Sequence, residues 1–456
     1  MSMLNIASTG LNANRVSLNT TAQNIANVNT EGYSRQDVLL SSIAGQYDEP
    51  GRGVQVSSIR RITEDYLTKQ LWQSSNLSAN ANSFHQYMAS MEGIIGSDSI
   101  DLSSGINAFI SSAHELTVRP ESLAYRQQML SSADSLAQKF NLMSQAINNQ
   151  HQTLSSDRTT IIDDINGQVA NIASYNSKII ELSNLGENTA ILEDKRDVLI
   201  KELSENVSIT TVYPGDGSIE ISLPNGEPLV MKSSHATVVA TPLASDPFQA
   251  TISISLSGQS FPVSSGEIGG RLGAIENMQN TVILPSLDVI NDMARELADE
   301  VNGLLLTGTD LNGNTPGAAL FTYTAGYEAE SFTTSGITAQ ELALSIDGTL
   351  GDGSLAEAIA AVEKTDFSIS GYGTMTLSEA FAVLTGNIAI SAQQAVTEQD
   401  ANQILLNQAV ASRDAVSGVN SDEEAANLIK YTNNYNANMK VISTANTLFN
   451  SILNAF

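Results

Sequence analysis

Residues 4–25, LNIASTGLNANRVSLNTTAQNI, and residues 428–456, LIKYTNNYNANMKVISTANTLFNSILNAF, decide the fold. Each stretch repeats an apolar residue every seven positions, which is two turns of an α-helix. The repeating residues are Leu4, Leu11, Leu18 and Ile25 in the first stretch and Leu428, Tyr435, Ile442, Phe449 and Phe456 in the second. Each stretch therefore predicts a helix with an apolar seam. Because the two seams match, we expect the two ends of the chain to pair with each other.

These two ends are almost free of charge, although the chain as a whole is strongly acidic. The formal net charge is -28, but residues 1–30 carry only Arg15, and residues 427–456 carry only Lys430 and Lys440. Helices that face water normally carry charged outer faces. The pattern favours burial by other protein subunits over the alternative, which is a pair of ordinary surface helices. The acidic balance also argues against partners such as nucleic acid or an anionic membrane surface.

Between the ends, the sequence predicts a long helical body with a β insertion. Stripes at helical spacing fill residues 77–91, 130–147, 162–179, 272–301 and 381–416, with a kink expected near Pro285. Short β-branched runs over 205–265 predict a small antiparallel β domain. Residues 308–376 show weak periodicity and predict loops in a minor lobe. The fold class is thus mainly α with an inserted β domain.

Helical patterns resume after each insertion, so we expect parts made of early and late sequence together. The predicted division has four parts. It comprises a terminal helical pair (1–33 plus 420–456), a helical body (34–204 plus 266–307 plus 377–419), the β domain (205–265) and the minor lobe (308–376).

Turn signals mark where the terminal helices meet the body. In AQNIANVNTEGYSRQ (22–36), asparagines that tolerate left-handed backbone and Gly32, which adopts it freely, end the first helix. Near the other end, Gly418 breaks the preceding helix. Ser421 and Glu424 then have the spacing of a capping box, which predicts the start of the last helix.

No residue pattern in the chain points to an enzyme, a cofactor or a metal site. There are no cysteines, and the four histidines are scattered without a metal-binding spacing. Asp310, Asn312 and Asn314 resemble a calcium loop, but Thr315 and Phe321 stand where such a loop needs glycine and glutamate. Phosphate-loop and nucleophile-elbow motifs are also missing.

The motifs at both ends resemble those of flagellar axial proteins. SLNTTAQNIANVNTEGYSRQ (17–36) is similar to the N-terminal motif of rod, hook and hook-associated proteins, and VSGVNSDEEAANLIKY (416–431) is similar to the C-terminal motif of the hook-associated protein 1 family. GRGVQVSSIRRITEDYL (51–67) and ILEDKRDVLIKEL (191–203) match that family in character. The motif residues that carry the resemblance are Asn24, Asn27, Asn29, Gly32, Tyr33, Arg35, Gln36, Gly418, Asp422, Glu423 and Glu424.

This resemblance implies a structural subunit at the junction between the flagellar hook and filament. The implied partners are the hook protein, a second hook-associated junction protein, further copies of the chain in a ring, and a cytoplasmic export chaperone at the C-terminal helix. The alternatives are another axial protein, such as a hook subunit, a rod subunit or the second junction protein, or a secreted coiled-coil effector or adhesin.

The start of the chain lacks the basic and apolar regions of a secretory signal peptide, and no long apolar run predicts a membrane span. We therefore expect export to the extracellular flagellum by its own type III route, without a cleaved signal peptide.

Overall fold

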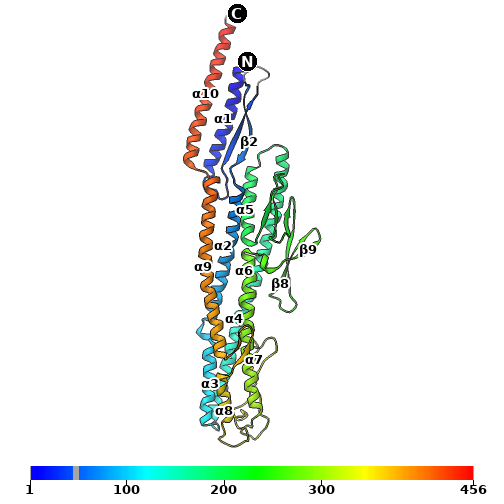
Figure 1. The fold of residues 1–456 in the computed structure, drawn as a ribbon, viewed down its shortest axis with the longest axis vertical. Coiled ribbons are helices and arrows are strands. Elements are labelled where there is room, and N and C mark those ends of the chain that lie inside the picture. The colour runs from blue at the N-terminus through cyan, green and yellow to red at the C-terminus, as the bar shows by residue number, and fades with distance from the viewer. Residues whose placement is uncertain (1, 45–50, 455–456) are drawn as a thin grey trace.

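The computed structural model describes residues 2–44 and 51–454 and shows a long, narrow molecule (Figure 1). Helices α1 (Ser2–Ala26) and α10 (Ser421–Leu453) lie side by side at one end and run in opposite directions. The predicted pairing of the two chain ends is therefore confirmed.

A bundle of long helices forms the rest of the rod. These helices are α2 (Asp65–Ile95), α3 (Leu102–Val118), α4 (Leu123–Asn184), α5 (Ala190–Asn206), α6 (Gly270–Met278), α7 (Leu284–Leu306) and α9 (Leu377–Ser417). Helix α4 has 62 residues, which corresponds to a length of roughly 93 Å. Its apolar stripe faces the core, where Phe140, Ile147, Leu154 and Val169 are fully buried.

A change in helix type joins α6 to α7 close to the predicted kink. Residues Gln279–Ile283 form a π-helical turn, and Pro285 lies in the first turn of α7. The amide of Leu284 donates to the carbonyl of Gln279, five residues back, so the helix stays continuous while its hydrogen-bond pattern changes next to the proline, which has no amide to donate.

A hairpin connects the terminal pair to the body. Strand β1 (Gln36–Ile43) pairs with β2 (Gly53–Arg61) in antiparallel register, so that Gln36 lies opposite Arg61. Helix α1 lies between this hairpin and α10.

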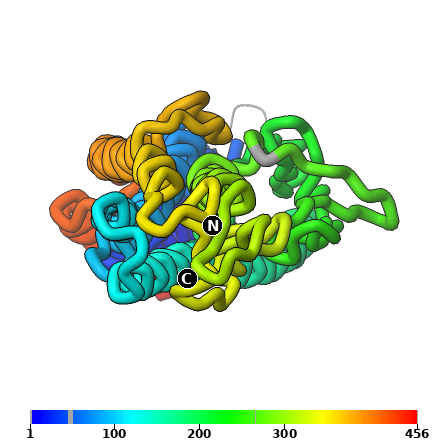
Figure 2. The backbone as a smooth tube through the Cα atoms, turned by 90° about the horizontal axis from the view of Figure 1, so that it is seen from below, coloured from blue at the N-terminus to red at the C-terminus, as the bar shows by residue number. Residues whose placement is uncertain are grey.

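Residues 210–262 form two small antiparallel sheets on one side of the bundle. One contains β3 (Thr210–Val212), β4 (Glu220–Ser222), β5 (Pro228–Met231) and β6 (Ser234–His235), and the other contains β7 (Thr237–Pro242), β8 (Ala250–Leu256) and β9 (Gln259–Pro262). Figure 2, viewed along the long axis, shows this insert in green beside the helices. The predicted fold class, mainly α with an inserted antiparallel β domain, is confirmed.

The segment after α7 closes the far end of the rod. It contains the short strand pairs β10 (Phe321–Thr322) with β11 (Thr333–Thr334) and β12 (Phe367–Ile369) with β13 (Gly373–Met375), and helix α8 (Ser354–Ala361). Short 3₁₀ turns lie at Asp98–Ile100, Ser265–Glu267 and Val362–Lys364. Phe321 and Phe332 stack with ring centroids 4.8 Å apart and are buried in the core of the body.

Candidate assembly interface

The contact surface of α1 is made of small and polar residues. Its fully buried positions are Ala7, Gly10, Ala13, Ser17, Thr20, Thr21 and Asn24. A Cβ atom at Gly10 would lie 2.9 Å from Oδ1 of Asn438 in α10, so the two helices approach closely at this level. The interaxial distance between packed helices depends on the side chains at the contact.

The predicted leucine seam only borders the contacts that α1 makes within the single molecule, and its role in an assembly stays a prediction. Leu4, Leu11 and Leu18 are half-buried, and Ile25 is 38% exposed. Small side chains occupy the line of closest approach, so the larger leucines lie along its margin.

The predicted α10 seam is also only partly covered. Tyr435 and Ile442 are half-buried, Leu428 is 39% exposed and Phe449 is 59% exposed. Phe456 lies outside the described residues. The covered side of α10 includes the seam residues Tyr435 and Ile442 and consists of Glu424, Asn427, Tyr431, Tyr435, Asn438, Val441, Ile442 and Ala445.

The last turns of α10 expose an apolar face. Leu448, Phe449, Ile452 and Leu453 are each more than half exposed, and we call these four residues the α10 tip. In Figure 1 this end of α10 projects beyond the start of α1. A contiguous apolar face that a single molecule leaves exposed is typical of an interaction site, so the tip has the character of a surface that another subunit covers.

The turn from α1 to β1 is held by Asn24, which is almost completely buried. Its amide Nδ2 donates to the carbonyl of Gln36 at 2.9 Å, and its Oδ1 accepts hydrogen bonds from the Tyr33 hydroxyl at 2.8 Å and the Gln36 amide at 3.0 Å. Burial, together with the nearby charges of Asp194 and Glu424, raises the pKa of Tyr33 to about 12. The phenol therefore stays a neutral donor.

Gly32 takes the predicted left-handed conformation, with φ +77°, but it lies in the turn after α1, which already ends at Ala26. A Cβ atom here would lie 2.2 Å from a methyl group of Val198 in α5, so packing also requires glycine. Asn27 and Asn29 do not take the left-handed conformation that their residue type allows. The Asn27 side chain instead donates to the carbonyl of Gln23, and Asn29 is exposed.

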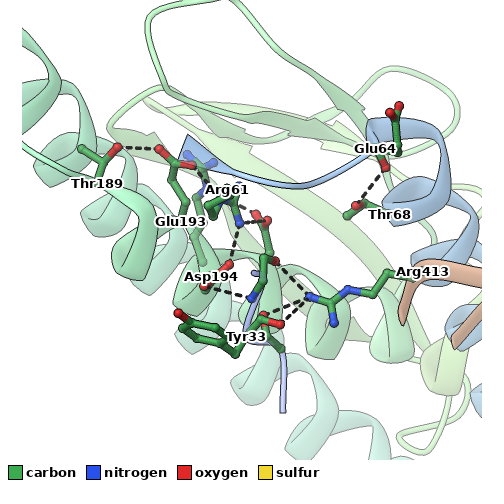
Figure 3. A network of polar contacts seen from close by, with 12 residues as sticks. Tyr33, Arg61, Glu64, Thr68, Thr189, Glu193, Asp194 and Arg413 are labelled. Atoms are coloured by element: carbon green, nitrogen blue, oxygen red, sulfur yellow. Dashed lines mark hydrogen bonds and ion pairs between the residues drawn. The ribbon is translucent and has the colours of Figure 1, made fainter. Parts of the chain in front are cut away.

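An arginine at the end of β2 fastens this turn to α5 (Figure 3). The guanidinium of Arg61 lies 2.8 Å from Glu193, 2.9 Å from Asp194 and 2.7 Å from Asp197. Burial lowers the pKa of Arg61, but the three carboxylates outweigh this effect and raise it. The second oxygen of Asp194 accepts the backbone amide of Ser34 at 3.2 Å. We call residues 30–36, together with the side chains that hold them, the neck.

Helix α9 holds the neck from the other side. Nη2 of Arg413 donates to the carbonyls of Gly32 and Tyr33 and, at 3.0 Å, to the Ser34 hydroxyl. Figure 3 shows Arg413 reaching toward Tyr33 opposite the Arg61 cluster. The amide of Arg35 donates to the carbonyl of Ser417 at 2.8 Å. The terminal pair is thus fixed to two different body helices.

The neck arginines were not predicted. Arg61 and the acidic residues of α5 lie in two segments that resemble the family, at 51–67 and 191–203, but no contact between these segments was predicted. The sequence does contain a feature that indicates a basic partner for α5: three carboxylates on one helical face, at positions 193, 194 and 197, in a chain with few basic residues. Their partner is more than 130 residues away in sequence.

The start of α10 differs from the predicted capping box. Asn420 is the N-cap, and its side chain accepts the amides of Asp422 and Glu423. Ser421 is the first helical residue, and asparagine caps a helix as well as serine does.

Glu424 points away from the helix end and is buried against α1. Burial raises its pKa, while hydrogen bonds from Asn24 and Thr21 act in the opposite direction. Glu423 forms an ion pair with Arg35, and Asp422 is exposed.

Gly418, at the end of α9, has no room for a side chain, because a Cβ atom would lie 2.5 Å from the carbonyl oxygen of Asp414. The two end motifs therefore meet in space at the neck.

Within residues 2–44 and 51–454, no group of three or more histidine, aspartate or glutamate side chains is placed to hold a metal ion. Over the same residues, no helix is both long and apolar enough to cross a membrane.

Three family models match the chain. The model of the helical domain of flagellar hook-associated protein FlgK matches residues 88–321. The flagella basal body rod protein model matches residues 4–33, and the C-terminal model of the flagellar basal body rod FlgEFG proteins matches residues 413–455. The two rod-type matches thus cover α1 and α10, the pair described above.

Relatives that match almost the whole chain are named flagellar hook-associated protein 1. Flagellar hook-associated protein 1 of Bacillus subtilis is 27% identical over 99% of this chain and 97% of its own length. The protein of the same name from Salmonella typhimurium is 24% identical over 99% of both chains. The solved structure of the flagellar hook junction protein FlgK from Burkholderia pseudomallei matches 78% of this chain and 100% of its own, with a TM-score of 0.68 at 14% identity, which shows a shared fold. Since the FlgK helical-domain model covers just over half of the sequence, this chain belongs to the flagellar hook-associated protein 1 (FlgK) family.

Proposed function

We propose that this chain is a structural subunit of the bacterial flagellum that forms the junction between hook and filament. The observation that carries the proposal is the α10 tip, whose four apolar side chains are exposed in the single molecule. Burying apolar surface stabilises an assembly by about 25 cal/mol per Å², so the tip favours packing among other subunits. The paired helices α1 and α10 would then enter the axial core.

The proposed partners follow from this placement. The hook protein contacts one side of the junction layer, the second hook-associated junction protein contacts the other side, and further copies of the chain complete a ring. The scarcity of charge on α1 and α10 supports contacts of this kind, because charged groups are costly to bury without a partner.

The four-part division of the chain gives each part a proposed role. Residues 1–33 with 420–456 act as the axial unit. The body segments 34–204, 266–307 and 377–419 form an outer layer. The β domain at 205–265 lies on one side of this layer, and the lobe at 308–376 closes its far end (Figure 1).

We further propose export to the extracellular flagellum through its own type III apparatus, without a cleaved signal peptide. A cytoplasmic chaperone would cover the α10 tip before export, since an exposed apolar helix end promotes aggregation. Deleting residues 422–456 is expected to abolish chaperone binding in a pull-down. Retained binding would show that the chaperone recognises another surface.

Electron microscopy of a strain that lacks this chain tests the main proposal. The expected result is complete hooks without filaments, with flagellin lost to the medium. Missing hooks would indicate a rod or hook subunit instead, and normal filaments would exclude an axial role.

A further inference from the structure

Helix α9 carries a second regular face, which the fold of the single molecule does not use. Its buried face, with Leu384, Ile388, Ala395 and Ala409, packs toward the body, chiefly against α2. On the other side, ten exposed residues follow each other at alternating steps of four and three. We call them the α9 stripe, which consists of Val383, Asn387, Ile390, Gln394, Thr397, Ala401, Ile404, Gln408, Ala411 and Ala415.

None of the ten stripe residues is charged, although the helix carries charges elsewhere, as at Glu398, Asp400 and Asp414. Ile390 is 67% exposed and Ile404 is 68% exposed. A water-facing stripe this long normally includes charged side chains. The spacing is that of a coiled-coil seam, which buries its residues against a second helical surface.

The absence of charge indicates what covers the stripe. A basic partner would be attracted best by carboxylates, which the stripe lacks. A partner that carries the same strong negative charge can approach closely only where the surface is neutral. With a net charge of -28, a second copy of this chain is such a partner.

The position of the stripe agrees with this occupant. Helix α9 leads into α10 through Gly418, Val419 and Asn420, and the two helices follow one another along the same side of the rod (Figure 1). Copies placed side by side through their α10 helices would also meet along α9.

We propose that the α9 stripe is a lateral contact between neighbouring copies of this chain. This inference rests on the proposed function and extends it, because it places a self-contact on the body as well as on the terminal pair.

Photo-crosslinking in assembled flagella tests the proposal. p-Benzoylphenylalanine replaces Gln394 or Gln408, which lie on the stripe, and in a control strain it replaces Leu350, which is 77% exposed at the far end of the rod. After irradiation, the two stripe positions are expected to give an adduct of two copies, with both crosslinked peptides from this chain. Position 350 is expected to give no such adduct.

A second change tests whether the neutral character of the stripe matters. Ala401→Asp places a charge in the stripe and is expected to reduce the adduct from position 408 at least tenfold, because an unpaired charge in an interface costs several kcal/mol. Ala401→Ser is the matched control and is expected to keep the adduct. An unchanged yield in Ala401→Asp would overturn the proposal.

The remaining outcomes are also decisive. If the chain is present in purified flagella but its stripe positions crosslink only to other proteins, or to none, the proposed self-contact is wrong. If the chain is absent from purified flagella, the proposed function fails, and this inference fails with it.

Discussion

Nη1 of Arg61 lies 2.9 Å from Oδ1 of Asp194, and the other carboxylate oxygen of Asp194 accepts the backbone amide of Ser34. One aspartate therefore links the end of the hairpin, the turn after α1 and helix α5. The Arg61 side chain is only 11% exposed, so water screens this link weakly. The neck sets the direction of the terminal pair relative to the rod.

Arg61→Ala is expected to lower the free energy of unfolding by about 3 kcal/mol, because it leaves three carboxylates close together without their shared cation. Urea unfolding followed by circular dichroism measures this change. Arg60→Ala is the matched control. The Arg60 side chain is 58% exposed and forms only a 3.9 Å contact with Asp37, so the expected change is within about 0.5 kcal/mol. Equal effects of the two substitutions would contradict the role given to Arg61.

Tyr33→Phe removes the hydrogen bond to Asn24 and is expected to destabilise the fold by about 1 kcal/mol below pH 10. The pKa of Tyr33 is raised to about 12 in the folded chain, whereas its ordinary value is 10.0. The folded state therefore holds this proton more tightly than the unfolded state does, and stability is lost as the pH rises from 10 through 12.

The variant has no phenol at this position and escapes that loss. The difference in unfolding free energy between wild type and Tyr33→Phe should therefore narrow between pH 10 and pH 12. Urea titrations below and within this range measure it. A constant difference would mean that Tyr33 titrates normally.

Gly10→Val is expected to loosen α10 from α1, because the added side chain meets Asn438 where a Cβ atom alone would lie at 2.9 Å. Overpacking of this kind costs about 1–3 kcal/mol. Hydrogen exchange of α10 amides measures the effect. Asn438→Ala in the same chain should restore much of the protection, and Gly93→Val, at a position with open space, is the control. Unchanged exchange in Gly10→Val would mean that the helices do not approach closely in solution.

The sequence predicted the helices, the β insert and the pairing of the two ends, because each follows from a local period or from a motif at a chain end. It did not predict which residues fill the contact between α1 and α10. Heptad leucines suggested the seam, but Gly10 allows the backbones of α1 and α10 to approach, and this depends on the facing helix. The spacing of residues within one helix cannot show which side chains a distant segment places against it.

The same limit applies to the neck. Arg61 and Arg413 act on partners more than 130 residues away, so no window of the sequence contains both members of a contact. The left-handed conformation of Gly32 could be predicted, because a turn that needs positive φ favours glycine locally. The lack of space for a side chain at Gly32 could not be predicted, because Val198, which fills that space, comes from another part of the chain.

Phe449→Asp separates assembly from folding. Phe449 is 59% exposed in the single molecule, so the free energy of unfolding of the isolated chain should change by no more than about 0.5 kcal/mol. In the assembly the same position is proposed to be buried, where an unpaired carboxylate costs several kcal/mol.

The strain that carries Phe449→Asp should therefore export a folded chain but form hooks without filaments, as counted by electron microscopy. Leu185→Asp, at a 70% exposed position on the body, is the matched control and should support normal filaments. Normal filaments in the Phe449→Asp strain would show that the α10 tip is not part of the interface. Loss of stability in the isolated chain would instead show that the tip packs within the single molecule.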